Sequence, residues 1–414
     1  MIPRFTPSME WCDIWAASSN SLHQDHAVAS FEAVFAEHAN QEYAVAFPYG
    51  RTGLNFLLRA LGLDNREIIC PAYTCVVVPN AVVYSGNRPV FIDSSRDDAN
   101  MDIRAAEQAI TDNTGAIIAT SIFGHPVNLD LLDELRSRHP SLPIIQDCAH
   151  SFFADWDGRP VHKEGCATLF ALNISKLSCS VFGGMVTTDD HALALRLREL
   201  RDAELAPATT WKTVSRFLYS VAAVTAFNST LYGLTLKLQR AHLLDRFTKY
   251  YEANLIDMPD DWLDALSNFE ARVGISSLTR LGDRISARRQ YATYYREKLK
   301  NHPAIRFFPL PPQADASYSH CAVLVSNPQE VRETCRRQGV ELGELIEYVV
   351  PLMDAYRDTA ETAGDFLVSK AISNRVINLP VASKFVQSHA DRAIKVLLKV
   401  LESQPPAPDL LECA

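Results

Sequence analysis

The sequence predicts an α/β fold, with a large domain built on a mostly parallel central sheet and a smaller α+β domain after it. Short apolar runs of strand type alternate with helical segments between Tyr43 and Asp190, and this order favours a parallel sheet covered by helices on both faces. The chain has 414 residues, 47% of them hydrophobic, which is enough for two or three domains.

The expected elements follow in order along the chain. A Pro-containing arm precedes a helical stretch with Phe31, Val34 and Phe35 on one face. Strands are expected at residues 43–47, 67–71, 89–93, 116–120, 143–147, 167–172 and 183–190, and helical stretches at 54–61, from about 73, 102–110 and 129–138. A long helical stretch follows at residues 266–299, and from Pro303 onward the pattern is that of a small α+β domain.

Composition and charge exclude several classes of protein. The net charge of −9 is spread along the chain without a basic block, which argues against nucleic acid as a partner. The nine cysteines form no CxxC pair and no Cys/His spacing that suits zinc, so we expect reduced thiols in a cytoplasmic protein and no metal site. The first residues, MIPRFTPSMEW, lack the apolar core of a secretory signal.

The stretch TLFALNISKLSCSVFGGM, residues 168–185, is the first candidate for chemistry. Its lysine, Lys176, follows an apolar strand and precedes a turn at Gly183 and Gly184, so we expect a pocket to hold it. Burial lowers the pKa of a lysine, and a neutral amine can form a Schiff base with an aldehyde cofactor. The alternative is a surface lysine that leaves a strand.

A second candidate is the acid in SLPIIQDCAHS. Asp147 ends a short apolar run, and His150 follows three residues later. An acid at the end of a buried strand is costly unless a cation meets it. The alternative is an Asp that caps a following helix.

A third candidate is an anion site in YAVAFPYGRTGLNFLL. A turn with Gly50 opens a helix, and free N–H groups at a helix start bind anions. We expect Arg51 and Thr52 to hold a phosphate there, with Gly53 allowing close approach. The alternative is a helix cap with an exposed arginine.

These stretches together resemble the DegT/StrS-type family of pyridoxal-phosphate enzymes, best known as nucleotide-sugar aminotransferases. QDCAH, LFALNISK and GGMVTTDD match the family's acid, lysine and glycine motifs, and the order extends over most of the chain. The resemblance implies the fold type I architecture, pyridoxal 5′-phosphate as cofactor, glutamate as the usual amino donor, a keto-sugar nucleotide as acceptor, and a homodimer.

The resemblance also implies roles for single residues. Lys176 would hold the cofactor and carry a proton, and Asp147 would keep the ring nitrogen protonated. His150 would contact the cofactor near its phenolic oxygen or support Asp147. Asn173 and Ser175 are candidate polar contacts to the phosphate or the ring.

Several positions depart from the family pattern. Cys75 stands where an aromatic ring commonly stacks on the cofactor, so either Tyr73 takes over that contact or the Cys75 thiol packs against the ring. Ala171 replaces a serine, Phe182 replaces a glutamate, and LDAL replaces the "NYR" that supplies an asparagine to the neighbouring subunit.

The resemblance divides the chain into regions. We expect a large cofactor-binding domain at residues 1–265, with an apolar helical insertion at about 205–250. A linking helix and the small domain take residues 266–404, and residues 405–414 form a tail. Within the insertion, residues 217–236 carry no charge. They predict a helix pair buried at a dimer interface, a peripheral membrane contact or a membrane span.

Three other functions are compatible with parts of this pattern. Some family members are dehydratases with a histidine in place of the lysine, and Lys176 argues against that variant. An aminotransferase for a non-sugar ketone remains open. A catalytically weak regulatory or scaffold protein is the third possibility, because several family positions have changed.

Overall fold

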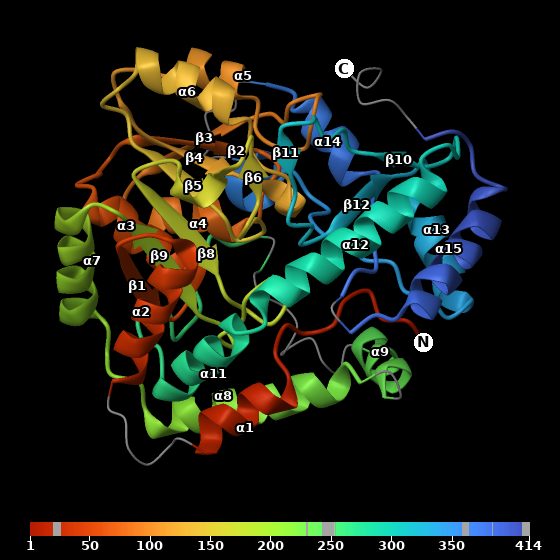
Figure 1. Ribbon diagram of the computed structural model, residues 1–414. Coiled ribbons are helices and arrows are strands. Elements are labelled where there is room, and N and C mark those ends of the chain that lie inside the picture. Colours follow the sequence, from red (N-terminus) through yellow and green to blue (C-terminus); the bar gives the residue numbers. More distant parts are fainter. Residues whose placement is uncertain are drawn as a thin grey trace.

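The computed structural model describes residues 1–19, 26–228, 231–241, 252, 254–357, 364–382 and 384–407 (Figure 1). Its centre is a seven-stranded sheet with the strand order β1-β9-β8-β5-β4-β2-β3. The pairs among β8, β5, β4, β2 and β3 are parallel, and β9 is antiparallel to both of its neighbours. The sequence-based expectation of a mostly parallel sheet is therefore confirmed. The strands are β1 (Tyr43–Phe47), β2 (Glu67–Pro71), β3 (Arg88–Ile92), β4 (Thr114–Thr120), β5 (Ile144–Asp147), β8 (Ala167–Ala171) and β9 (Gly184–Thr188).

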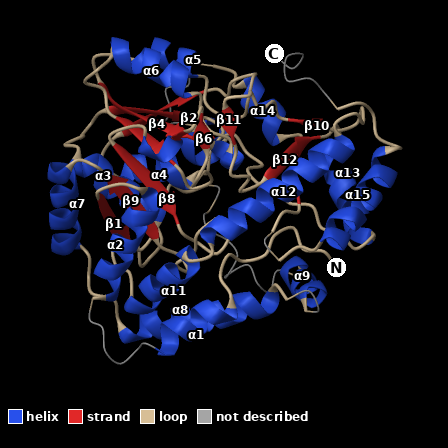
Figure 2. Ribbon diagram, in the orientation of Figure 1, coloured by secondary structure: helices blue, strands red, loops and turns tan. Residues whose placement is uncertain are grey.

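Helices cover both faces of this sheet (Figure 2). Every residue of β4 is buried, as expected for a strand between two helical layers. The helices of one layer are α2 (Ala27–Ala39), α5 (Ile103–Gln108), α6 (Leu129–Arg138) and α11 (Asn268–Leu278). Those of the other layer are α3 (Gly50–Ala60), α4 (Val77–Tyr84) and α7 (His191–Glu204).

The small domain packs around a second, antiparallel sheet with the order β10-β12-β13. A third small sheet, β11-β6-β7, joins a small-domain segment to a hairpin of the large domain. The elements of this part are β6 (Asp155–Trp156), β7 (Arg159–Pro160), α12 (Leu281–Leu299), β10 (Arg306–Phe307), β11 (Ala314–Asp315), β12 (Cys321–Leu324), α13 (Pro328–Arg337), α14 (Leu367–Ser373), β13 (Val376–Leu379) and α15 (Gln387–Leu401). Short 3₁₀ turns lie at Ile122–Gly124, Val161–Lys163, Val350–Leu352 and Asp354–Tyr356.

Contacts cross the expected division of the chain in two places. The N-terminal arm, expected in the large domain, contacts the small domain, because Ile2 pairs with Val340 and packs in the small-domain core. In the other direction, Val350 and Tyr356 pack in the core of the large domain. The chain therefore passes between the two domains more often than the expected division into residues 1–265 and 266–404 implies.

Two helix predictions need correction. The stretch 266–299 forms two helices rather than one, because α11 ends at Leu278 and α12 begins at Leu281. A capping box of Ser267 and Glu270 fixes the start of α11. Residues 73–75 do not begin a helix, since they lie in the turn before α4.

The apolar insertion forms two helices, α8 (Thr210–Ala226) and α9 (Tyr232–Arg240). Figure 1 shows them along one edge of the molecule, beside α1 (Trp11–Ser19). None of the helices in the described part of the chain combines the length and the apolar character that crossing a membrane requires. The rest of the insertion at 242–250, and residues 408–414 of the expected tail, lie outside the described residues.

Candidate active site

Lys176 lies in the loop that joins β8 to β9. Two backbone hydrogen bonds close this loop at its base: Leu172 donates to the carbonyl of Gly183 at 2.8 Å, and Ser180 donates to the carbonyl of Leu172 at 2.8 Å. The N–H of Lys176 donates to the carbonyl of Asn173 at 3.0 Å. The hairpin thus holds Lys176 in a short closed loop at the end of β8.

The polar residues around Lys176 shape this loop. The side-chain oxygen of Asn173 accepts hydrogen bonds from the N–H of Ser175 at 3.0 Å and from its hydroxyl at 2.7 Å. The hydroxyl of Ser8, in the N-terminal arm, donates to the carbonyl of Lys176. Asn173 and Ser175, expected as cofactor contacts, therefore bond to each other in this structure and fix the turn before the lysine.

Two glycines let the start of α3 lie against the lysine loop. A Cβ on Gly184 would lie 2.5 Å from the backbone nitrogen of Gly50, and a Cβ on Gly50 would lie 3.1 Å from the Cβ of Ala171. Such contacts exclude a side chain at Gly184. The first turn of α3 is thereby brought next to the strand end that leads to Lys176.

The amine of Lys176 has no hydrogen bond or ion pair with any described residue. Only a minor part of the residue is exposed, and burial lowers the pKa of its side chain. Cys75 and Asp147 are the ionisable neighbours that oppose this shift. A buried lysine without a hydrogen-bonded counter-ion carries a larger share of neutral amine than a surface lysine.

Asp147 is buried at the carboxyl end of β5, the strand next to β8. Its carboxylate accepts hydrogen bonds from the hydroxyl of Thr120 at 3.2 Å and from the N–H of Ala149 at 3.1 Å. Burial raises the pKa of Asp147, and the charge of Lys176 opposes the shift. The two residues therefore meet at neighbouring strand ends, where ligands bind in open α/β sheets.

His150 faces a residue of the small domain that the sequence did not single out. Its ring lies 4.9 Å, centroid to centroid, from the ring of His320. Burial, followed by the charge of Lys176, lowers the pKa of both histidines well below its ordinary value. Both rings are consequently neutral near pH 7, and the small domain contributes to the site.

Arg288 on α12 is a further residue that sequence reasoning missed. It is buried, and one of its terminal nitrogens donates to the carbonyl of Ser319 at 2.6 Å, beside His320. Burial lowers the pKa of Arg288 to about 10. A histidine directly before the strand in SHCAVLV was the signal available for His320, whereas nothing in the helical pattern distinguishes Arg288.

The expected anion site is at the start of α3, where the first-turn N–H groups of an 11-residue helix begin at Gly50. Arg51 is half-buried, and burial lowers its pKa, although Cys75 opposes the shift. The hydroxyl of Thr52 donates to the carbonyl of Trp262 at 3.1 Å. Gly53 faces the sheet, because a Cβ there would meet Val186 at 3.1 Å.

The two candidates for the cofactor ring lie in different surroundings. Cys75 interacts electrostatically with both Lys176 and Arg51. Tyr73 is buried instead in an apolar cluster, with its ring 6.1 Å from that of Phe123. Of the two candidates, Cys75 is therefore the one with an interaction that joins it to the lysine.

The residues present fit pyridoxal phosphate. The Nδ1 atom of His150 is buried and has no hydrogen-bond partner in the described part of the chain. The amine of Lys176 is unpaired, and Asp147 has no cation hydrogen-bonded to it among the described residues. Buried polar groups are normally satisfied, so these open positions suit a bound group with an aldehyde and a basic ring nitrogen, and the start of α3 suits its phosphate.

Known proteins share both the sequence and the architecture. The erythromycin biosynthesis sensory transduction protein EryC1 of Saccharopolyspora erythraea is 27% identical over 373 residues, which cover 89% of this chain and 88% of that protein. GDP-perosamine synthase of Escherichia coli O157:H7 is 28% identical over 313 residues, covering 73% of this chain and 82% of the relative. The crystal structure of DesV from S. venezuelae has a TM-score of 0.75 at 23% identity and covers 95% of this chain and 94% of its own.

The architecture is that of the fold type I aminotransferases. A family model matches residues 14–245 and 264–398, so it includes both strand ends of the site and most of the small domain. The matched range contains Asp147, Lys176 and His320. The chain belongs to the DegT/DnrJ/EryC1/StrS aminotransferase family.

Proposed function

We propose that this chain is a pyridoxal-phosphate-dependent aminotransferase that transfers an amino group from glutamate to the keto group of a sugar attached to a nucleotide. The observation that carries the proposal is the partly buried Lys176, whose amine has no hydrogen-bond partner among the described residues, beside Asp147 at the ends of two neighbouring parallel strands, β8 and β5. Family membership supports the reaction class. The relative named GDP-perosamine synthase supports a sugar nucleotide as acceptor.

Three parts of the chain would hold the cofactor. Lys176 would hold it through its amine, Asp147 would bind the ring nitrogen, and the first turn of α3 would bind the phosphate. Bound pyridoxal phosphate supplies an aldehyde for the amine and a ring that withdraws electrons from the reacting carbon. We also propose that the enzyme works as a homodimer.

Lys176 has a second task as the general base. Because burial lowers the pKa of Lys176, its amine is neutral more often near pH 7 than that of a surface lysine. A neutral Nζ can take a proton from the substrate carbon that bears the amino group and return it later. The closed loop between Leu172 and Gly183 keeps this atom in place.

The surrounding residues orient the reacting groups. Thr120 and the N–H of Ala149 fix the Asp147 carboxylate in one direction, so its free lone pairs can accept an N–H bond. The neutral rings of His150 and His320 offer one donor and one acceptor each without adding a like charge beside Lys176. Arg288 holds the backbone next to His320.

An absorbance spectrum of the purified protein tests the proposal. After incubation with pyridoxal phosphate, the protein should show a visible band of covalently bound cofactor. Glutamate should remove this band and release 2-oxoglutarate, and a keto-sugar nucleotide should restore it. A protein that binds no cofactor, or whose band does not respond to glutamate, would contradict the proposal and favour a regulatory or scaffold role.

A non-sugar ketone that restores the band where sugar nucleotides fail would keep the reaction class and change the substrate. Tests with GDP-linked and dTDP-linked keto-sugars, beside simple keto acids, separate these outcomes.

A further inference from the structure

Helix α8 of the insertion is amphipathic in the opposite sense to an ordinary surface helix. The two charged residues of α8, Lys212 and Arg216, point toward the protein, while Trp211 and Leu218 are 75% and 56% exposed. A surface helix normally turns its charges outward and its apolar side chains inward. An inverted helix indicates that something other than water covers its outer side.

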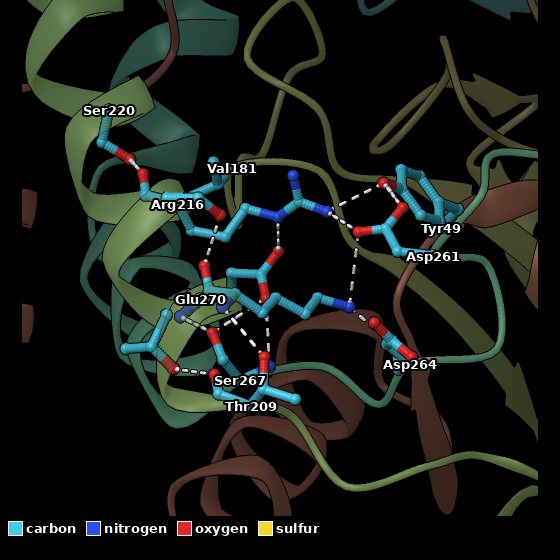
Figure 3. Close-up of polar contacts among 12 residues, drawn as sticks. Tyr49, Val181, Thr209, Arg216, Ser220, Asp261, Asp264, Ser267 and Glu270 are labelled. Carbon is cyan, nitrogen blue, oxygen red and sulfur yellow. Dashed lines mark hydrogen bonds and ion pairs between the residues drawn. The ribbon is translucent and has the colours of Figure 1, made fainter.

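The inward charges are well paired, which fixes the orientation of α8 (Figure 3). Arg216 binds the carboxylate of Asp261 at 2.5 Å and lies 3.2 Å from that of Glu270. The amine of Lys212 donates to the carbonyl of Asp264 at 2.8 Å. Rotating α8 to bury its tryptophan would break these pairs, so the apolar side stays outside.

α1 repeats the same arrangement next to α8. Its one charged residue, Asp13, is fully buried and bound by Arg280, whereas Trp15 is 77% exposed. Residues of both helices, Ile14 on α1 and Ala223 on α8, pack in one hydrophobic cluster with α11. Because both helices rest on α11, their outer sides point away from it together.

α9 extends this surface beyond the end of α8. The hydroxyl of Thr235 donates to the carbonyl of Ala226 at 2.8 Å, which packs α9 back on α8. Leu234 and Leu238 of α9 are exposed. We call the surface formed by Trp11, Trp15, Trp211, Leu218, Leu234 and Leu238 the outer apolar face.

Charge decides between a lipid surface and a second copy of the chain. The sequence contains no Asp or Glu between Glu204 and Asp245, although the whole chain has a net charge of −9. Lys237, on α9, is exposed beside the outer apolar face. The basic residues of α8 are already paired beneath it. Two copies of this face would bring their Lys237 side chains to the same surface, whereas anionic lipid head groups complement a lysine.

The aromatic content points the same way. Three of the five tryptophans of the chain lie on the outer apolar face. Tryptophan favours the boundary between head groups and acyl chains, because its ring is apolar and its N–H needs a polar partner. Figure 1 shows α1, α8 and α9 along one edge, as expected for helices that lie in the plane of a membrane surface.

We propose that the outer apolar face seats the protein on the surface of an anionic lipid bilayer, with α1, α8 and α9 lying at the level of the head groups. Co-sedimentation with vesicles of phosphatidylcholine containing phosphatidylglycerol tests this. The protein should sediment with them, more strongly than with phosphatidylcholine alone. Its tryptophan emission should shift to shorter wavelength, because three of the five indoles leave water.

Two matched variants locate the contact. Leu218→Glu should reduce the partition coefficient by at least about tenfold, because a buried leucine contributes about 1.5–3 kcal/mol. Leu195→Glu, at a 43% exposed leucine of α7 away from the face, should leave it unchanged. Trp15→Ser serves as a second test variant, and far-UV circular dichroism checks folding in all three.

Three results of these binding experiments would contradict the membrane-surface proposal in whole or in part. The proposal would be overturned if the wild type failed to bind the anionic vesicles. It would also be overturned if Leu218→Glu and Leu195→Glu lowered the partition coefficient equally. Equal binding to neutral vesicles would overturn the role of charge. If Leu218→Glu halves the particle mass in light scattering while the wild type stays off the vesicles, the outer apolar face joins two copies instead.

Discussion

Two regions of this protein bury basic side chains, and they treat them in opposite ways. In the candidate active site, Lys176 is buried without a hydrogen bond or ion pair to a described residue, and burial lowers its pKa. Under α8, Arg216 is similarly removed from water but meets Asp261 and Glu270. The amine of Lys176 has no hydrogen-bonded counter-ion among the described residues, whereas the guanidinium of Arg216 is held by carboxylates on two sides.

This difference separates chemistry from architecture. Burial without a partner disfavours the charged form of an amine. A larger share of the amine is then neutral and can act as a base. A paired guanidinium cannot react, since it stays protonated, but it fixes α8 against the start of α11. Burial alone therefore does not identify a basic side chain as functional. The absence of a hydrogen-bonded counter-ion is the distinguishing feature.

The strongest test of the comparison is Lys176→Met. Activity should fall by at least about a thousandfold, because the variant loses both the cofactor anchor and the base. Its thermal stability without cofactor should be equal to or above that of the wild type, since an amine that burial removes from water has been replaced by an apolar side chain. Activity assays, the visible spectrum and thermal unfolding measure this. A retained cofactor band would show that another lysine is the anchor.

Arg216→Met should have the opposite profile. The substitution leaves the buried Glu270 without its guanidinium partner and Asp261 with the more distant amine of Lys212, which should cost about 3 kcal/mol of unfolding free energy in urea titrations. Arg138→Met is the matched control, because its pair with Glu107 lies at the surface, where ion pairs contribute little to stability. Equal stability of the two variants would show that the ion pairs of Arg216 contribute no more than a surface ion pair.

Asp147→Asn tests the role of the carboxylate within the candidate site. The amide is nearly the same size, so the variant should still bind cofactor. It cannot keep a ring nitrogen protonated, and turnover should fall by about a hundredfold. Steady-state rates and a cofactor titration separate binding from turnover. Rates near those of the wild type would exclude this role for Asp147.

The smallest predicted effect is on the pH dependence of stability. Burial lowers the pKa of His150 and His320 below their ordinary value of 6.5, so the folded protein keeps both rings neutral. Below about pH 6.5 the unfolded chain binds more protons than the folded one, and stability falls as the pH falls. Each ring contributes at most about 1.4 kcal/mol per pH unit.

A His150→Asn/His320→Asn double variant should therefore lose less stability than the wild type between about pH 7 and about pH 5 in urea titrations. His125 and His162, whose pKa burial lowers to about 4, are present in both proteins and form a common background. Parallel stability curves would show that neither ring is held neutral by the fold.

The large sheet could be predicted from the sequence, and so could two residues of the candidate site, Asp147 and Lys176. Apolar runs typical of buried strands, with a polar residue at or just after their ends, are local sequence patterns. His320 comes from the other domain, and the sequence does not show that the domains meet at His150. The direction of α8 could not be predicted either, because hydropathy alone does not distinguish an inward from an outward apolar side.

The N-terminal arm has a mechanical consequence. Ile2 is paired to Val340 in the small domain, and Ser8 bonds to the backbone of Ile174 and of Lys176. The arm thus acts as a strap between the small domain and the lysine loop, in addition to α12 and the β6–β11 pairing. A rigid-body swing of the small domain would pull on Lys176 itself. The position of Lys176 is therefore coupled mechanically to that of the small domain.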